Sequence, residues 1–126
     1  MLTIGNVVKL KTELLGNEPG TLGIVYDEYE FHGRNESWKG VSIIFTNGEY
    51  DGFSEEEQEL FLEFVEHKHD FRYQFSNVMK LSRDFEAGFF EPFIGKKQNH
   101  MFENFRIGRQ KDVKTSVVDD NKFRSV

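Results

Sequence analysis

Residues 40–53 read GVSIIFTNGEYDGF and carry the strongest local signal in the chain. The dipeptide Asn47-Gly48 is typical of a type I′ turn, because both central positions of that turn need a positive φ. Apolar and β-branched residues flank the dipeptide on both sides. We therefore predict two antiparallel strands joined by a tight turn, with Ile43, Phe45 and Phe53 on the face that enters the core.

Two further segments with strand composition precede this hairpin. Residues 3–10 and 20–29 are rich in β-branched and apolar side chains, and turn-forming residues separate them. Gly23 lies inside the second segment, where a glycine indicates a bulge or a close approach of backbone, and we expect the strand to bend there. Residues 30–38 are polar and irregular apart from two rings, which predicts a loop between the second and third strands.

Five motifs thus follow one another along the first 53 residues. They are Val7-Val8-Lys9-Leu10, Gly20-Thr21-Leu22-Gly23-Ile24-Val25, Val41-Ser42-Ile43-Ile44-Phe45, Asn47-Gly48 and Phe53. In this order they resemble the small SH3-like barrels of the KOW type, which use a Gly-x-x-Gly-x-Val strand, a Val-x-Val-x-Phe strand and an Asn-Gly turn. The resemblance covers about residues 3–53 and implies a small β-barrel. Such barrels serve nucleic-acid-binding, ribosomal, adaptor and inhibitor proteins alike, so it does not define a function.

The following residues predict short helices and a second hairpin. Ser54-Glu55-Glu56-Glu57 has the spacing of a capping box, which begins a helix. Residues 60–66 fit both a helical stripe and strand alternation, and we expect a short helix that passes into a strand. Residues 71–81 begin with alternating rings and polar side chains, so we predict that they pair with this strand through a polar connection at 67–70. A last short helix begins at Ser82 and ends before Pro92.

Composition bounds the class of protein. A chain of 126 residues suits one domain. It contains no cysteine, which excludes disulfides, thiolate chemistry and cysteine-ligated metals, and which fits a reducing compartment. No stretch approaches the roughly 18 apolar residues of a membrane span, and the first residues lack the apolar core of a signal peptide. We therefore expect a cytoplasmic protein without a membrane anchor.

Charge divides the chain into two parts. Residues 1–95 carry 8 Lys and Arg against 18 Asp and Glu, a net charge of −10, whereas residues 96–126 carry 8 against 4, a net charge of +4. The basic part also holds too many Phe, Val, Ile and Met residues for a solvated tail. We expect a mainly β (α+β) fold, in which an acidic SH3-like barrel body with a hairpin extension and short helices spans 1–95. The tail, 96–126, is expected to dock on the same domain or on a second copy in a homodimer.

Motifs for catalysis and metal binding are weak. The segment 16–20 lacks the Lys and Ser/Thr of a phosphate-binding loop, and no nucleophile elbow is present. The glutamates of residues 55–66 are dense enough to form a solvated face rather than an acid–base pair. His67-x-His69 lacks a third ligand and fits a solvated connection. We therefore expect no enzyme activity, no catalytic residue, no metal and no cofactor.

The sequence instead favours binding to another macromolecule. Trp38 and Arg34 are residue types that anchor interfaces, and with Phe31 and His32 they form an aromatic and basic cluster on the expected loop. Tyr29 and Tyr50, with Glu49 and Asp51, are expected to add an acidic, tyrosine-bearing surface that suits a basic protein partner. An inhibitor, immunity or adaptor protein has these properties. The alternative is a nucleic-acid-binding barrel that grips phosphates with the tail residues Lys96, Lys97, Arg106, Arg109, Lys111 and Lys114.

Overall fold

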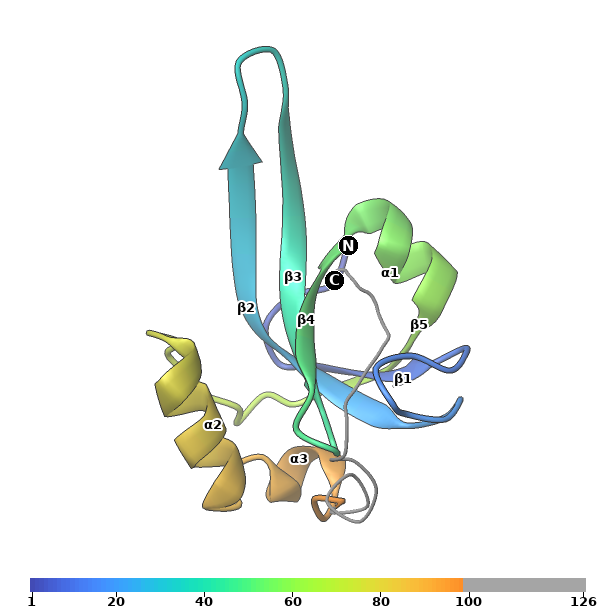
Figure 1. The fold of residues 1–126 in the computed structure, drawn as a ribbon, viewed down its shortest axis with the longest axis vertical. Coiled ribbons are helices and arrows are strands. Elements are labelled where there is room, and N and C mark those ends of the chain that lie inside the picture. The colour runs from blue at the N-terminus through green and yellow to red at the C-terminus, as the bar shows by residue number, and fades with distance from the viewer. Residues whose placement is uncertain (99–126) are drawn as a thin grey trace.

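The computed structural model describes residues 1–98 (Figure 1). Five strands form one antiparallel sheet in the order β4-β3-β2-β1-β5, and three short helices accompany it. The elements are β1 (Asn6–Leu10), β2 (Leu22–His32), β3 (Ser37–Phe45), β4 (Tyr50–Ser54), α1 (Glu55–Phe61), β5 (Leu62–His67), α2 (Val78–Glu86) and α3 (Glu91–Ile94). The predicted mainly β fold is confirmed at this level. The sheet is not closed, since no pairing joins β4 to β5 within the described residues.

The hairpin of residues 40–53 forms as predicted, but through a different turn. β3 pairs with β4, and Ile43, Phe45 and Phe53 are all buried. The Gly48 N–H donates to the Phe45 carbonyl, while the Phe45 N–H donates to the Glu49 carbonyl, both at 2.9 Å. Gly48 alone has a positive φ, 90°, so the loop has the pattern of a type I turn followed by a glycine bulge. The type I′ prediction is therefore wrong.

Hydrogen bonds of the Asn47 side chain account for this turn. Its Oδ1 accepts from the Glu49 N–H at 3.0 Å, and its Nδ2 donates to the Leu15 carbonyl at 3.0 Å. The second contact joins the turn to the connection between β1 and β2. That connection contains the consecutive positive φ angles of a type I′ turn, 53° at Leu15 and 78° at Gly16. The buried amide of Asn47 therefore connects two loops instead of supplying a left-handed residue.

One face of the sheet encloses a core to which every strand contributes. The buried cluster comprises Val8, Leu10, Val25, Val41, Ile43, Phe45, Phe53 and Leu62. Phe53 belongs to β4 and Leu62 to β5, which are the two edges of the sheet. In a flat sheet, four strand spacings would separate these edges by about 19 Å. α1 joins the end of β4 to the start of β5 over only about 12 Å of helix, so the sheet curls although its edges do not pair. α1 spans the gap, and its buried Gln58 donates from Nε2 to the Phe53 carbonyl at 3.1 Å.

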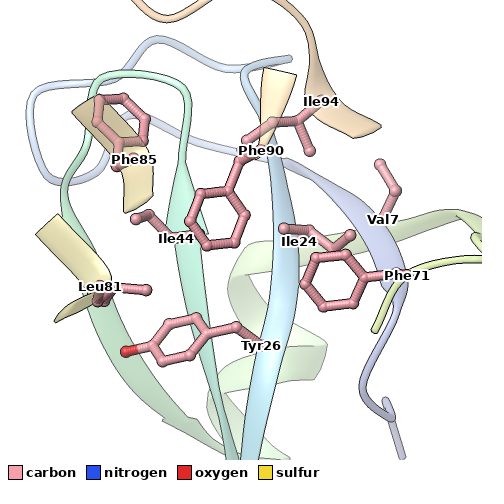
Figure 2. Close-up of a cluster of buried hydrophobic side chains, with 9 residues drawn as sticks. All are labelled: Val7, Ile24, Tyr26, Ile44, Phe71, Leu81, Phe85, Phe90 and Ile94. Atoms are coloured by element: carbon pink, nitrogen blue, oxygen red, sulfur yellow. The ribbon is translucent and has the colours of Figure 1, made fainter. Parts of the chain in front are cut away.

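The other face is covered by the chain between residues 71 and 94. Figure 2 shows the cluster, whose members are Val7, Ile24, Tyr26, Ile44, Phe71, Leu81, Phe85, Phe90 and Ile94. Strands that are buried on both faces carry consecutive apolar residues, which explains the pairs Val7-Val8 and Ile43-Ile44. The Tyr73 hydroxyl, on this covering segment, donates to Asp84 of α2 at 2.7 Å.

The prediction for residues 54–67 is confirmed, whereas the prediction for residues 71–81 is wrong. Ser54 caps α1 in a capping box with Glu57, and α1 passes directly into β5. β5 pairs with β1, and residues 71–77 form no strand. Their alternating rings instead point to the sheet face, where Phe75 packs 5.2 Å from Tyr26 between ring centroids.

The boundaries of the last helices also differ from the prediction. Asn77, not Ser82, caps α2, since its side chain accepts from the Lys80 N–H at 2.9 Å. Ser82 lies inside α2. Pro92 occupies the first turn of α3, where proline is tolerated because its missing N–H would have no partner in the helix.

Two predictions for β2 and β3 are wrong. The irregularity of β2 lies between Val25 and Asp27 rather than at Gly23. At Gly23 a Cβ would lie 2.6 Å from the Phe45 ring, so this glycine provides space for the core. The expected loop at 30–38 is mostly strand, and only the turn from Gly33 to Glu36 separates β2 from β3.

No helix within residues 1–98 is long and apolar enough to cross a membrane. The chain from residue 99 onward lies outside the described residues, and so does most of the expected docked tail. Residues 96–98 are described, and the Gln98 N–H donates to the Thr46 carbonyl at 2.8 Å. The chain therefore leaves the described domain beside the β3–β4 turn.

Adjacent phenylalanines test whether the covering segment belongs to the core. Phe90 is 1% exposed and Phe89 is 38% exposed. We expect Phe90→Ala to lower the free energy of unfolding by about 3–5 kcal/mol, because it leaves a cavity between two layers. Phe89→Ala should cost less than about half as much. Urea denaturation measures both, and equal effects would show that the segment does not pack as described.

Candidate interaction surface

The ends of β2 and β3 project from the body as a two-stranded arm (Figure 1). We define the β2–β3 arm as residues 29–40. Its pairs are Tyr29–Gly40, Glu30–Lys39, Phe31–Trp38 and His32–Ser37. β4 reaches only to the pair Gly40–Ser54, and β1 pairs with β2 only at residues 22–24. The arm therefore extends past the neighbouring strands on both sides.

One face of the arm is aromatic and exposed. Phe31 and Trp38 stand directly opposite each other, with ring centroids 4.8 Å apart and planes inclined by 27°. Tyr29 meets Trp38 edge to face at 6.3 Å. Phe31 is 46% exposed and Trp38 is 44% exposed. Rings of this size usually contribute to a core, so a stacked and half-exposed pair marks a surface suited to binding.

Glycines beneath Tyr29 set the position of its ring. A Cβ at Gly40 would lie 2.3 Å from the Tyr29 ring, and one at Gly52 would lie 3.0 Å from its hydroxyl. The ring therefore lies flat over β3 and β4 where no side chain intervenes. Burial raises the pKa of Tyr29, and the nearby carboxylates of Glu57 and Asp51 raise it further.

Charged residues occupy the opposite face of the arm. The pair Glu30–Lys39 alternates with the aromatic pairs, so it points the other way. Lys39 lies 4.0 Å and His32 lies 3.5 Å from the Glu30 carboxylate. The arm is thus an amphipathic ribbon with one apolar face in water.

The predicted partner-binding residues fall into two groups. Tyr29 and Trp38 touch on the arm, and Arg34 is exposed in the turn at its tip. Glu49, Tyr50 and Asp51 belong to the β3–β4 hairpin. Tyr50 pairs with Ile44, six residues along β3 from Trp38, which is about 20 Å at 3.3 Å per residue.

Tyr50 shares the sheet face of the arm rings despite this distance. It is half-buried, and burial raises its pKa, with further contributions from Glu49 and Asp51. Tyr26 precedes both groups in sequence and is buried against the covering segment. The exposed aromatic surface is therefore centred on the arm, and Tyr50 lies at its far end.

Phe31 was grouped with Trp38 on the expected loop but was not among the predicted partner-binding residues, although it completes the stack. Its spacing of two residues from Tyr29 is the signal that could have identified it, because residues two apart share a face of a strand. The assignment of residues 30–38 to a loop hid that signal. Once both strands extend to the turn, the pairing of Phe31 with Trp38 follows from the register.

The histidine pair and the tail cations are the other candidate sites in the sequence. His67 and His69 pack at 4.7 Å between ring centroids, and His67 Nδ1 lies 3.0 Å from Asn6 Nδ2. Residues 1–98 contain no group of three or more His, Asp or Glu side chains that could hold a metal ion. Lys97 contacts Glu86 through Nζ, and Lys96 is exposed. Arg106, Arg109, Lys111 and Lys114 lie outside the described residues.

No family model, curated protein or solved structure matches this chain. The chemistry that the surface offers is recognition: two stacked rings, a third ring packed on glycines, and the carboxylates of Glu57 and Asp51 near that third ring. Each of these groups can bury apolar area or oppose a positive charge on a partner.

A double-mutant cycle tests whether the Tyr29 ring packs against Gly40. Gly40→Ala should lower the free energy of unfolding by about 1–3 kcal/mol, because the new Cβ would lie 2.3 Å from the Tyr29 ring and 2.8 Å from the Phe53 carbonyl oxygen. Tyr29→Ala relieves the first of these contacts only. Combining the two substitutions should cost at least about 1 kcal/mol less than the sum of the single changes. Urea denaturation of the four proteins gives the coupling energy. Strictly additive effects would contradict the contact.

Tyrosine ionisation supplies a pH test. The pKa values of all four tyrosines, Tyr26, Tyr29, Tyr50 and Tyr73, are raised above the ordinary 10.0, with burial as the largest cause. The unfolded chain loses these protons first, so the stabilising contribution is complete below pH 10 and declines as the pH rises above it. We expect tyrosinate absorbance to appear late in the folded protein. Tyr26→Phe should reduce the loss of stability, and titration of every tyrosine near 10 would contradict the burial.

Proposed function

We propose that this chain is a non-catalytic binding protein whose β2–β3 arm docks on a basic surface of another protein. The observation that carries the proposal is the exposed stack of Phe31 and Trp38 on a projecting arm. Burying two such rings against a partner removes apolar area from water, at about 25 cal/mol for each Å². Tryptophan is also among the residues that dominate binding energy at interfaces.

The arm is organised for binding before any partner arrives. Four residue pairs fix its strands, and the Tyr29 ring packs against the Trp38 ring and over Gly40. A surface that is already ordered loses less conformational entropy on association. This supports direct docking of the arm rather than folding upon binding.

The charge of the body favours a basic partner. Residues 1–95 carry a net charge of −10, whereas the arm itself is neutral, because Arg34 and Lys39 balance Glu30 and Glu36. Carboxylates attract a basic protein over a distance of about 8 Å at physiological ionic strength, and they repel a phosphate backbone. This supports an inhibitor, immunity or adaptor type of protein over a nucleic-acid-binding one. We place its action in the cytoplasm because a chain without cysteine suits a reducing compartment.

We further propose that the curled sheet is an open SH3-like barrel. The return of β5 to β1 and the shared cluster of Phe53 and Leu62 support this assignment. The absence of β4–β5 pairing within the described residues leaves the barrel open on that side. Because such barrels serve many functions, the proposal for the arm rests on its side chains rather than on the fold.

Replacing Trp38 by Ala tests the function. The full-length chain, Trp38→Ala and the matched control Leu60→Ala are immobilised, and proteins captured from lysate of the native cells are quantified by mass spectrometry. We expect a protein with a basic surface whose capture falls by about thirtyfold in Trp38→Ala, which corresponds to about 2 kcal/mol. Leu60 is exposed on α1, away from the arm, so its variant should capture as much as the unchanged chain.

Kinetics with the recovered protein then separate the roles of rings and charges. Trp38→Ala should speed dissociation, whereas Glu49→Lys with Asp51→Lys should mainly slow association, because long-range charge acts on encounter. Nuclease treatment of the lysate should change nothing. Recovery of nucleic acid alone would overturn the proposal in favour of the nucleic-acid-binding alternative.

A further inference from the structure

A second surface lies where α1, β5 and the first residues of the chain meet. An open groove of about 570 Å³ lies there, and its lining includes Met1, Leu2, Lys11, Glu55, Glu59 and Phe64. Phe64 is 55% exposed although it stands opposite Val8 of the core. The groove thus combines apolar side chains with the carboxylates of Glu55 and Glu59 and with the ammonium group of Lys11, whose Nζ donates to the Glu59 carbonyl at 2.6 Å.

β5 also presents an open edge. It is the last strand of the sheet, and within the described residues it pairs only with β1. Such edges attract another extended chain unless charge prevents it. A second copy is a poor occupant, because pairing β5 with itself over its full length sets Glu63 opposite Glu66 twice, and like charges placed opposite are destabilising. The carboxylates of Glu55 and Glu59 and the apolar side chains of Leu2 and Phe64 instead favour a basic and partly apolar segment.

The same chain carries such a segment. Residues 105–114 read FRIGRQKDVK, with Arg106, Arg109, Lys111 and Lys114 against a single acid, Asp112. Phe105, Ile107 and Val113 are interspersed with these cations. The cations of this segment complement Glu55 and Glu59, and its apolar side chains complement Leu2 and Phe64.

We infer that the basic stretch 105–114 docks in the groove between α1 and β5 of its own chain. The described residues end at Gln98, whose N–H donates a hydrogen bond to the Thr46 carbonyl. A fully extended chain from residue 99 reaches at most about 23 Å by residue 105 and about 53 Å by residue 114. A domain of this size has a diameter of about 30 Å, so the stretch comes within reach of the groove along its length. A segment tethered in this way has an effective concentration of about 1 mM, so even weak attraction fills the groove.

Photocrosslinking in the full-length chain tests the inference. The photoreactive residue p-benzoylphenylalanine replaces Phe64, and in a control protein it replaces Phe31 on the arm. After irradiation and digestion, mass spectrometry should find residues 105–114 joined to position 64 and not to position 31. Mixing isotope-labelled and unlabelled chains separates attachment within one chain from attachment between copies. A bond within the same chain supports the inference.

Charge variants make the test specific. Glu55→Lys with Glu59→Lys should lower the crosslink yield at position 64 at least about threefold, and Arg106→Glu with Arg109→Glu should restore it. The matched control Glu30→Lys with Glu36→Lys makes the same change of net charge on the arm and should leave the yield unchanged. Glu55→Lys also destabilises the first turn of α1, so a second measurement leaves Glu55 and Glu59 unchanged. In that protein the crosslink yield at position 64 should fall as the salt concentration rises.

Three outcomes would overturn the inference. They are crosslinks only between copies, crosslinks from position 64 only to residues 1–98 or none at all, and a yield that responds equally to the groove and arm variants. The docking of residues 105–114 in the groove does not involve Trp38, so its failure would not contradict the proposed function of the arm.

Discussion

The burial of both faces of one five-stranded sheet is the constraint on which the rest of the structure depends. A curled sheet encloses one apolar cluster by itself, but its outer face also carries Val7, Ile24, Tyr26 and Ile44. A face of this kind needs a cover, and the chain supplies it from residues 71–94. The aromatic composition of the second half follows from this demand, because rings bury the most area for each residue ordered. The helices α2 and α3 are short because they need only hold Leu81, Phe85 and Ile94 against the sheet.

The same constraint explains why the arm is conspicuous. The covering segment reaches Tyr26, where Phe75 packs, and the next rings on that face of β2 are Tyr29 and Phe31. Within the described residues, the rings of Phe31 and Trp38 meet only aromatic neighbours of the arm itself. The stack therefore adds little to the core that holds residues 1–98 together.

Sequence patterns predicted elements correctly where interactions between residues close in the sequence decide the local structure. Asn47-Gly48 and the alternation of Ile43 and Phe45 predicted the β3–β4 hairpin, and Ser54 with Glu57 predicted the start of α1. Prediction failed where tertiary contacts decide between local options. The rings of residues 71–75 alternate as in a strand, yet they cover the apolar outer face of the sheet, where Phe71 joins the buried cluster and Tyr73 and Phe75 pack against it. Trp38 and Tyr29 were identified as interface types, but the stack with Phe31 depends on a register that no local pattern in residues 30–38 reveals.

The two proposed surfaces differ in how much they can depend on charge. On the arm, the rings are stacked on a ribbon whose charged groups point to the opposite face, so the apolar contact and the charges act separately. In the groove between α1 and β5, carboxylates of Glu55 and Glu59 line the same hollow as Phe64, so an occupant meets both at once. Exposed ion pairs contribute little each, about 0–1 kcal/mol, which is too weak to hold a free partner but enough to hold a segment tethered nearby. The arm, with its large rigid rings, is the surface suited to a partner from outside, and the groove is the one suited to a segment of the chain itself.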